Sequence, residues 1–327
     1  MTKASAEPRN ASAAPRASIY RGRFAPSPTG PLHFGSLIAA VASYCDARAA
    51  GGEWIVRMED VDSPRSHPGA ERDILSALER YGFEWDGPVV RQSERSALYA
   101  AALDELRAHD DVYPCACTRR EQDAAPTGAG GEHVYAGTCR DGVPADRMER
   151  TARAWRLRVG QVRIDWCDRL QGPQTQDLGR EVGDFVVRRA DGLFAYQLAV
   201  VVDDDLQGVT DVVRGADLIT STARQILLLQ RLGGTIPSYL HVPIAIGRDG
   251  EKLSKQTNAR SLPALPLPAL LAAWCFLEQP MPAGSGAPGT TAEFWQWAIS
   301  AWKPARLPPV SMLPAPPAFR PDPSGGV

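Results

Sequence analysis

The feature that most constrains this chain lies near its beginning, where an expected strand leads through a proline-rich loop into an expected helix. The strand covers residues 18–24, the loop 25–31 contains three prolines and a glycine, and apolar residues recur at helical spacing over 32–50. The start of such a helix presents unpaired backbone N–H groups and the positive end of the helix dipole, which favour a bound phosphate. The sequence therefore predicts an anion-binding turn within an α/β fold.

Two residues of this turn suit a nucleotide. Gly35 lacks a side chain, so a nucleotide can approach the backbone, and His33 can donate a hydrogen bond to a phosphate that gains charge in a transition state. The chain contains neither the sequence pattern of a P-loop nor that of a dinucleotide-binding turn. The alternative interpretation is a proline-rich entry loop that carries a surface histidine.

The residues that follow continue an alternation of strands and helices. Residues 54–58 are apolar enough for a buried strand, and helical patterns follow at 67–81 and 94–109. Such a succession is typical of an α/β nucleotide-binding sheet, so we expect a mainly parallel sheet flanked by helices.

The second half of the chain is expected to contain a hairpin among further strands and helices. Asp191-Gly192 suits a two-residue turn, so the runs 185–190 and 193–202 are expected to pair. Residues after 260 have a helical pattern that prolines interrupt. The other expected elements are a strand over 154–159, a helix over 219–232 and a strand over 241–246.

A pair of lysines forms a second candidate phosphate-binding motif. Lys252 and Lys255 follow the turn-forming dipeptide Asp249-Gly250 and are three residues apart, so both ammonium groups can converge on one ligand. Two mobile cations suit a polyphosphate leaving group. Taken alone, a solvated charged loop is the simpler interpretation of this segment.

Three of the six cysteines indicate a metal site. Cys115, Cys117 and Cys139 fall within 25 residues of sequence, and the other three cysteines are scattered. The chain has no recognisable secretory signal or membrane segment, so the clustering favours a metal over disulfides. Zn²⁺ prefers four ligands with thiolates among them, and His133 is the usual type of residue for the fourth place.

Five strings in a fixed order carry a resemblance to a known family. The first and the last are similar to the HIGH-like and KMSKS-like motifs of class I aminoacyl-tRNA synthetases, and the whole set resembles the glutamyl branch of that class. Two positions depart from the motifs: Ser36 replaces the last histidine of HIGH, and Gln256 replaces the last serine of KMSKS. The strings are residues 23–35, 57–62, 196–204, 213–217 and 251–256.

The resemblance implies a fold and an arrangement of segments. The implied fold is α/β, a class I synthetase Rossmann-like parallel sheet with an inserted zinc-bearing subdomain and a short helical C-terminal part. The expected segments are a disordered tail (1–17), a catalytic half (18–110), the inserted zinc and acceptor subdomain (111–185), a second catalytic half (186–246), the KMSKS-like loop with a helical stem-contact region (247–302) and a proline-rich, extended or disordered tail (303–327).

The resemblance also implies a glutamate pocket, an ATP site and a zinc site. Glutamate needs cations for its two carboxylates, here Arg23 and Arg214, and an anion for its ammonium group, here Glu59. At the metal site the family pattern favours Tyr135 over His133 as the fourth ligand. The implied residues are Arg23, Phe24, Ala25, Pro26, Ser27, Glu59, Tyr196 and Arg214 for glutamate; His33, Gly35, Ser36, Lys252 and Lys255 for ATP, with His33, Lys252 and Lys255 catalytic; and Cys115, Cys117, Tyr135 and Cys139 for the metal.

Length separates the members of the glutamyl branch. Only about 70 residues follow Lys255, too few for a large anticodon-binding part, so the chain resembles the short glutamyl-queuosine tRNA(Asp) synthetases. The resemblance implies a ligase that activates L-glutamate with ATP in the absence of tRNA. The ligase then transfers the glutamate to the queuosine base in the anticodon loop of tRNA(Asp). It also implies one structural Zn²⁺, ATP with Mg²⁺ as substrate, and a cytoplasmic monomer without a membrane partner.

Three alternatives remain open at this point. The first is a truncated glutamyl-tRNA synthetase that charges a tRNA 3′ end, and the second is a catalytically silent zinc protein that binds RNA. The third is a small-molecule nucleotidylyltransferase with the same His-x-Gly chemistry. In each RNA-binding case the contact is expected to be local, because the formal net charge is only -2. Residues 147–163, with six arginines and one glutamate, are expected to face phosphates.

Overall fold

The computed structural model describes residues 19–62, 67–123, 127, 133–151, 153–253, 260–282 and 286–320. The expected tail 1–17 and the second lysine of the KMSKS-like loop, Lys255, lie outside the described residues. The expected strands and helices of the first hundred residues are confirmed within a few positions at their ends.

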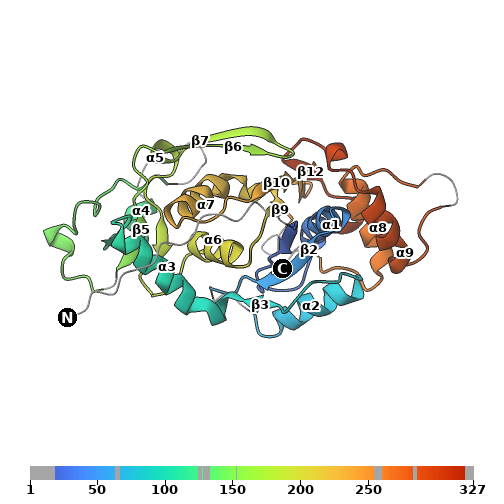
Figure 1. The fold of residues 1–327 in the computed structure, drawn as a ribbon, viewed down its shortest axis with the longest axis horizontal. Helices are drawn as coiled ribbons and strands as arrows, with labels where there is room; N and C mark the ends of the chain where they lie inside the picture. The colour runs from blue at the N-terminus through green and yellow to red at the C-terminus, as the bar shows by residue number, and fades with distance from the viewer. Residues whose placement is uncertain are drawn as a thin grey trace, which may run out of the picture.

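A seven-stranded sheet forms the centre of the molecule, with the strand order β3-β2-β1-β9-β10-β6-β7 (Figure 1). Neighbouring strands from β3 to β6 run parallel, and β6 and β7 form an antiparallel hairpin at one edge. Because these strands run parallel, the carboxyl ends of β1, β9 and β10 meet at one edge of the sheet. The strands are β1 (Arg21–Phe24), β2 (Glu53–Met58), β3 (Val90–Arg91), β6 (Arg163–Asp168), β7 (Gly172–Asp177), β9 (Asp211–Gly215) and β10 (Ser238–Val242).

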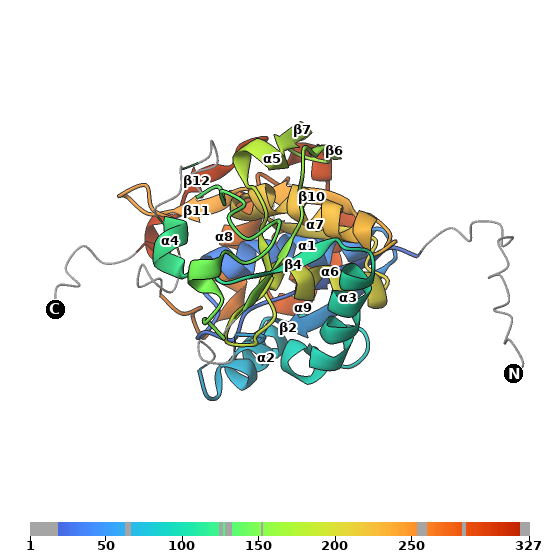
Figure 2. The same ribbon diagram turned by 90° about the vertical axis from the view of Figure 1, so that its left-hand side faces the viewer.

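Helices pack against this sheet around two apolar cores. One core joins β1 and β2 to α1, α2, α8 and α9, and the other joins α3, α6 and α7 to β9 and β10. Figures 1 and 2 place α1, α8 and α9 together on one side of the molecule. The helices are α1 (Phe34–Ala49), α2 (Ala70–Arg80), α3 (Ser96–Ala108), α6 (Tyr196–Leu206), α7 (Ile219–Arg231), α8 (Pro266–Phe276) and α9 (Thr291–Ala301).

A smaller antiparallel sheet carries the cysteine cluster at the other end of the molecule (Figure 1). It consists of β4 (Val112–Cys115), β5 (Ala154–Leu157) and β8 (Val186–Arg188), with the short helices α4 (Arg119–Asp123) and α5 (Leu178–Glu181) in the same stretch of chain. Because β8 pairs with β5, this sheet continues to Arg188, three residues past the expected end of the inserted segment. The β6–β7 hairpin of the same segment joins the central sheet instead.

The expected hairpin around Asp191-Gly192 is wrong in its second arm. The turn itself forms: Gly192 has a positive φ of 92°, and Arg189 N–H bonds to the Leu193 carbonyl at 2.8 Å. After a single bridge between Arg188 and Phe194, however, the chain enters the helix α6. A continuous apolar run does not distinguish a buried strand from a buried helix, which is why the sequence favoured the wrong one.

The expected strand over 241–246 divides into two strands that belong to different sheets. Pro243 stands between β10 and β11 (Ile244–Ile246), and proline has no N–H to continue a ladder. β11 pairs in parallel with β12 (Met312–Pro314) from the C-terminal segment.

The C-terminal segment is ordered as far as it is described. Of the two expectations for 303–327, an extended or a disordered tail, the second is wrong for residues 303–320, where β12 is extended and pairs with β11 in a separate two-stranded sheet. Beyond the pairing of β12 with β11, Phe319 stacks on Phe34 with ring centroids 4.1 Å apart. Ala315, in the same segment, is completely buried. Phe34 is the first residue of α1, so this segment supports the start of that helix.

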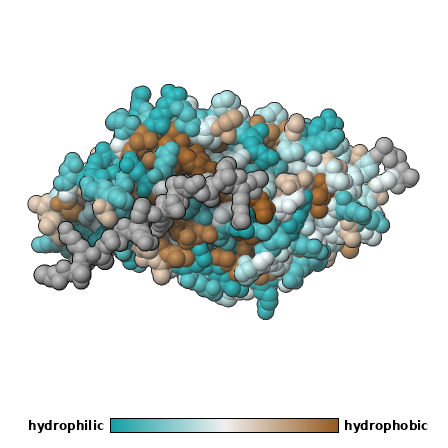
Figure 3. Space-filling view, viewed as in Figure 1, coloured by the Kyte–Doolittle hydropathy of each residue, from teal (hydrophilic) through white to brown (hydrophobic). Residues whose placement is uncertain are grey.

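The surface of the molecule is predominantly hydrophilic on the face shown in Figure 3. Hydrophobic residues on that face gather near the centre of the view, where α6 and α7 lie in Figure 1. Among the described residues, no helix combines the length and the apolar character needed to cross a bilayer.

Candidate functional site

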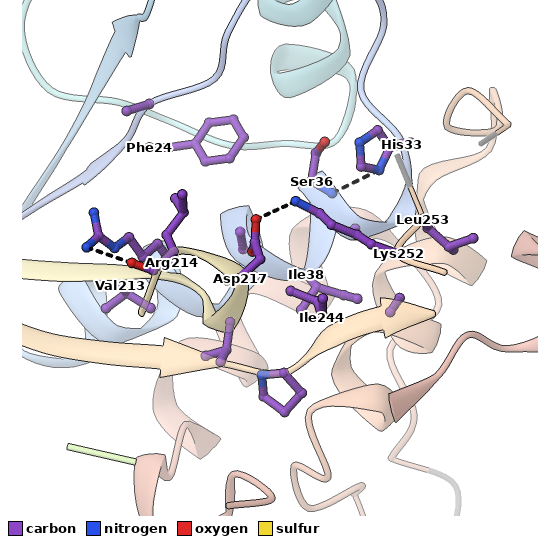
Figure 4. A pocket seen from close by; sticks show the side chains of 18 of the residues that line it. Phe24, His33, Ser36, Ile38, Val213, Arg214, Asp217, Ile244, Lys252 and Leu253 are labelled. Carbon is purple, nitrogen blue, oxygen red and sulfur yellow. Dashed lines mark hydrogen bonds and ion pairs between the residues drawn. The ribbon is translucent and has the colours of Figure 1, made fainter. Parts of the chain in front are cut away.

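A pocket lies where the carboxyl ends of β1, β9 and β10 face the start of α1. This edge is the usual ligand-binding position in open α/β sheets. The pocket wall also includes β11 and the beginning of the lysine loop, and Figure 4 shows these side chains converging from separate elements. The expected site residues that line it are Arg23, Phe24, Ala25, His33, Gly35, Ser36, Glu59, Tyr196, Arg214 and Lys252.

His33 caps the N-terminus of α1. Its Nδ1 accepts a hydrogen bond from the backbone N–H of Ser36 at 3.3 Å, so a neutral His33 carries its proton on Nε2. A Cβ on Gly35 would lie only 3.1 Å from the His33 ring and 3.4 Å from the Leu253 carbonyl. Because Gly35 has no side chain, the His33 ring and the lysine loop can lie close to the helix start. The Nε2–H donor of His33 then lies beside a helix end that favours anions.

Lys252 extends across the pocket from the lysine loop (Figure 4). Its ammonium group is 2.5 Å from a carboxylate oxygen of Asp217, which follows β9. The loop is held to β11 by a bridge between Lys252 and Ile246 and by the hydrogen bond from Leu253 N–H to the Ala245 carbonyl. Asp217 thus places the first lysine of the motif opposite the start of α1.

Arg23 and Glu59 belong to a buried network of charges. Arg57, which is fully buried, lies 2.7 Å from Asp204 and 3.5 Å from Glu59, and Arg23 lies 3.4 Å from Asp204. Asp204 on α6 therefore accepts from both arginines and holds the ends of β1 and β2 together. Such charges are tolerated inside a protein because each is paired.

The two acids of this network respond differently to burial. Burial raises the pKa of Glu59, and the charges of Arg57 and Arg23 offset only part of that effect. Burial also acts to raise the pKa of Asp204, but Arg23 and Arg57 outweigh it, and the net shift is downward. Of Glu59 and Asp204, Glu59 is therefore the acid whose ionised form the surrounding groups stabilise less.

Arg214 projects into the pocket from β9 and is 5% exposed. Its acceptors within the described residues are neutral: Nε donates to His241 at 3.0 Å, and Nη2 donates to Thr222 at 2.9 Å and to the Leu218 carbonyl at 3.3 Å. A buried guanidinium without a carboxylate in contact is costly unless an anion joins it. The pocket therefore holds a cation prepared for an anionic ligand.

His241 connects Arg214 to a buried carboxylate. Its Nδ1 lies 2.6 Å from Asp168, and both residues are inaccessible to solvent in their side chains. Burial lowers the pKa of His241 more strongly than its hydrogen bond with Asp168 raises it. The neutral form is consistent with the geometry, because the guanidinium of Arg214 can only donate to Nε2.

Of the remaining glutamate-site residues, Tyr196 and Ser27 border a pocket, whereas Pro26 lines neither this pocket nor the adjoining one. Tyr196, the first residue of α6, lines both this pocket and an adjoining one. Ser27 lies in the adjoining pocket, which shares Glu59 and Tyr196 with the first. The Pro26 carbonyl accepts a hydrogen bond from the backbone N–H of Glu59 at 3.0 Å. This bond fixes the backbone position from which the Glu59 side chain extends.

The cysteine cluster has a geometry that can hold a metal ion. The sulfur atoms of Cys115, Cys117 and Cys139 all lie within 4.8 Å of one another. The hydroxyl of Tyr135 is 3.3 Å from the first sulfur and 3.4 Å from the second, and it accepts from the backbone N–H of Cys139 at 2.9 Å. His133 is exposed and is not part of this cluster. Three thiols that could hold a metal ion therefore lie together, with one phenol beside them.

The expectation that the arginine-rich strip 147–163 faces phosphates is wrong for Arg156, which is buried, and for the other arginines it stays a prediction. Arg156 is 3% exposed and donates to the Asp184 carbonyl and the Cys115 sulfur, while Arg147 donates to the Cys117 sulfur. The ion pairs along the strip join Arg147 and Arg150 to Glu121, Arg158 to Asp110, and Arg163 to Asp165.

Several residues of the site carried too weak a signal for sequence reasoning. A single histidine or aspartate in an apolar strand pattern is usually a core residue, so His241 and Asp168 gave no separate indication. Asp204 and Arg57 fell within strings of the family resemblance without a role. A pair of acids at the end of an apolar helical run, as at 203–204, is the signal that could have revealed them.

Comparison with known proteins agrees with this site. The family model described as tRNA synthetases class I (E and Q), catalytic domain, matches residues 20–265. Among solved structures, a glutamate-tRNA synthetase from Elizabethkingia anophelis is similar with a TM-score of 0.72 and 26% sequence identity. That match covers 91% of this chain and 68% of the other. A glutamate tRNA ligase from Elizabethkingia meningosepticum, in complex with its amino acid, gives the same TM-score and identity over 90% and 67% of the two chains.

Two similar curated proteins carry the same name. A glutamyl-Q tRNA(Asp) synthetase from Aromatoleum aromaticum is 54% identical over 92% of this chain and 94% of its own length. A glutamyl-Q tRNA(Asp) synthetase from Thiobacillus denitrificans is 56% identical over 90% of this chain and 98% of its own length. With this identity over nearly the whole length of both chains, and with the class I catalytic-domain model matching residues 20–265, the chain belongs to the glutamyl-Q tRNA(Asp) synthetase family of class I ligases.

Proposed function

We propose that this chain activates L-glutamate with ATP in the absence of tRNA and then transfers it to the queuosine base in the anticodon loop of tRNA(Asp). The observation that carries the proposal is one pocket in which phosphate-binding groups adjoin an amino-acid site. A capped helix start and a lysine lie on one side, and two buried arginines with one acid lie on the other. The name of the relatives supports the same acceptor.

Glutamate is held by opposite charges at its two ends. The ammonium group pairs with Glu59. The pocket stabilises the ionised form of Glu59 poorly, so a cation beside it stabilises that form strongly. Arg214 and Arg23 receive the carboxylates. Arg214 has neutral acceptors within the described residues and therefore gains most from an added anion.

The first half-reaction joins glutamate to ATP. An oxygen of the α-carboxylate attacks the α-phosphorus, the bond to the bridging oxygen breaks, and pyrophosphate leaves with the electron pair. His33 Nε2–H and the N–H groups at the start of α1 donate to the phosphates. Lys252 and Lys255 neutralise the charge that develops on pyrophosphate, a role in which Mg²⁺ bound with ATP would assist them. Positioning and electrostatics supply the rate without an enzyme nucleophile.

The second half-reaction moves glutamate to the RNA. A hydroxyl oxygen of the queuosine diol attacks the carbonyl carbon of the mixed anhydride, an ester forms, and AMP leaves with the electron pair while the hydroxyl proton is released. The adjoining pocket shares Glu59 and Tyr196 with the amino-acid site and is lined by Asp62 and Arg189 as well. It supports an approach to the activated carboxyl from the side opposite the lysine loop.

The metal site is proposed to hold one structural Zn²⁺ through Cys115, Cys117, Cys139 and Tyr135. The bound ion would fasten the small sheet to the following loop. Cys117→Ser should release the metal, measured as zinc per chain, whereas the exposed Cys167→Ser should not. Faster zinc loss to a chelator in Tyr135→Phe but not in His133→Ala would support the phenol as ligand. Unchanged zinc content in Cys117→Ser would contradict the site.

The activation step is tested by pyrophosphate exchange without tRNA. Wild-type protein should exchange label between pyrophosphate and ATP when glutamate is present. Lys252→Ala should slow the exchange by about 100- to 1,000-fold, the usual effect of removing one group that stabilises transition-state charge. Lys303→Ala, a lysine outside the pocket, is the matched control and should be unchanged. Equal exchange in Lys252→Ala and wild type would overturn the assignment of this lysine.

A further inference from the structure

We propose that Asp168 and His241 form a buried positioning relay that holds Arg214 in the orientation in which it receives a substrate carboxylate. The inference rests on the proposed function, because it assigns Arg214 to glutamate. It concerns two residues that make no contact with the pocket themselves and act through the arginine.

Asp168 is fixed at the end of β6, next to the turn of the hairpin. One of its oxygens accepts from the backbone N–H groups of Leu170, Gln171 and His241, at 3.0, 2.8 and 3.3 Å. The other oxygen lies 2.6 Å from Nδ1 of His241. Its side chain is inaccessible to solvent. A carboxylate held by this many donors stays ionised and cannot rotate, so it accepts a hydrogen bond from Nδ1–H in one direction only.

This hydrogen bond selects the tautomer of His241. With Nδ1 protonated and bound to Asp168, Nε2 keeps its lone pair and points at Nε of Arg214, 3.0 Å away. The opposite tautomer would bring two N–H donors together. Asp168 thus makes Nε2 of His241 a hydrogen-bond acceptor. A guanidinium has only donors, so its neighbour must accept.

The acceptors of Arg214 fix the plane of its guanidinium. His241 takes the Nε–H, and Thr222 with the Leu218 carbonyl takes the hydrogens of Nη2. These acceptors are neutral, whereas Arg23 and Arg57 have Asp204 in contact. The relay therefore orients the guanidinium without placing a carboxylate against it, and Asp168 supports the positive charge from one residue away.

Other charged groups near the imidazole are consistent with this arrangement. Arg214 from β9 and Arg23 from β1 both disfavour a positive imidazole, and Asp168 from β6 opposes them. Tyr239 on the same strand stacks on the ring with centroids 6.1 Å apart. The ring has three hydrogen-bond partners besides this aromatic neighbour: Asp168 at Nδ1, and Arg214 and the Thr222 hydroxyl, 3.3 Å away, at Nε2. Its position is thus confined, and its tautomer is the variable that remains to be set.

The first test measures the tautomer directly. The chain has five histidines, so ¹⁵N-histidine labelling with two-bond ¹H–¹⁵N correlation spectra can assign them by single substitutions. The relay requires that His241 in the wild-type protein carries its proton on Nδ1. A proton on Nε2, or a doubly protonated ring at neutral pH, would overturn the inference whether or not the protein is active.

The second test uses Asp168→Asn in pyrophosphate exchange. The amide can donate to Nδ1, which allows the opposite tautomer and turns an N–H toward Arg214. We expect KM for glutamate to rise about tenfold or more, equivalent to about 1.4 kcal/mol, with KM for ATP unchanged. Asp46→Asn is the matched control, because Asp46 is a similarly buried carboxylate that bonds Arg169, Tyr20 and Trp302 away from the pocket.

The possible outcomes separate the relay from the proposed function. An unchanged glutamate KM in Asp168→Asn, with wild-type exchange intact, would overturn the relay alone. An equal rise in Asp46→Asn would assign the effect to general destabilisation and also contradict the relay. Absence of glutamate-dependent exchange in the wild type would contradict the proposed function. If Asp168→Asn does not fold, the tautomer measurement in the wild type still decides.

Discussion

Individual side chains in this pocket are distinguished by their partners more than by their type. Arg23, Arg57 and Arg214 are all buried, yet the first two contact Asp204 and the third donates to neutral groups. The sequence identifies arginines but not the acceptors that the fold brings to them. The same difficulty affected the strip 147–163, where Arg156 turned inward toward the cysteine cluster. Partner identity depends on contacts between distant segments, which local patterns do not contain.

The Glu59 carboxylate is expected to favour binding at the expense of stability. Because its pKa in the folded protein is raised, the folded state favours the protonated form. This contribution to stability is present below the ordinary pKa of 4.5 and is lost as the pH rises through the folded-state pKa. Glu59→Gln should therefore raise the melting temperature at pH 7, and the difference from wild type should shrink toward pH 4.5.

The same substitution should weaken glutamate binding. Loss of a charged hydrogen bond to the ammonium group, worth about 1.5–3 kcal/mol, corresponds to roughly a 10- to 100-fold rise in KM. Thermal melts at several pH values and exchange kinetics measure the two effects. Glu71→Gln, at a surface ion pair with Arg91, serves as the control and should change neither markedly. A variant that is less stable at pH 7, or that binds glutamate normally, would contradict this role.

At the scale of secondary-structure elements, the C-terminal segment supports the nucleotide side of the pocket. β12 pairs with β11, whose residues Ile244 and Ala245 line the pocket, and Phe319 stacks on Phe34 at the first turn of α1. Both contacts lie behind groups proposed to bind ATP. A proline-rich composition suggested a tail because it predicts no regular structure, although prolines also suit extended chain that packs along a sheet.

Phe319→Ala should therefore act on both stability and ATP binding. Removing a half-buried ring from an aromatic stack should cost about 1–2 kcal/mol. It should raise KM for ATP several-fold through the helix start and leave KM for glutamate unchanged. Denaturant unfolding and pyrophosphate exchange provide the measurements, with the exposed Val310→Ala of the same segment as control. Wild-type stability together with wild-type KM for ATP would refute the supporting role.

How far the sequence predicts the elements depends on where the deciding information lies. The helix start at His33 and the helices α2, α3 and α7 follow local periodicity, and they were predicted within a few residues. The α6 segment was not, because its apolar run suits either a buried strand or a buried helix. Pairing across the chain, as in β8 with β5 or β12 with β11, also escaped prediction, because register between distant strands is set by tertiary packing.

At the scale of the whole molecule, the pocket and the lysine loop lie at the central sheet, and the cysteine cluster lies on the smaller sheet at the other end. The central sheet extends from β3 to the β6–β7 hairpin, and the small sheet with the cluster lies beyond α3 and α6 (Figure 1). Thirty-six basic against 38 acidic residues give no general attraction to RNA, so recognition of a tRNA must come from particular contacts. The identity of the acceptor is accordingly the central claim to be tested at this scale.

The most direct test gives the protein ATP, labelled glutamate and two pools of tRNA. One pool contains queuosine, and the other comes from cells that cannot make it. The account predicts label only in the first pool, and nuclease mapping should place that label in the anticodon loop. Equal label in both pools, attached at the 3′ end, would contradict the account and indicate conventional charging of a tRNA.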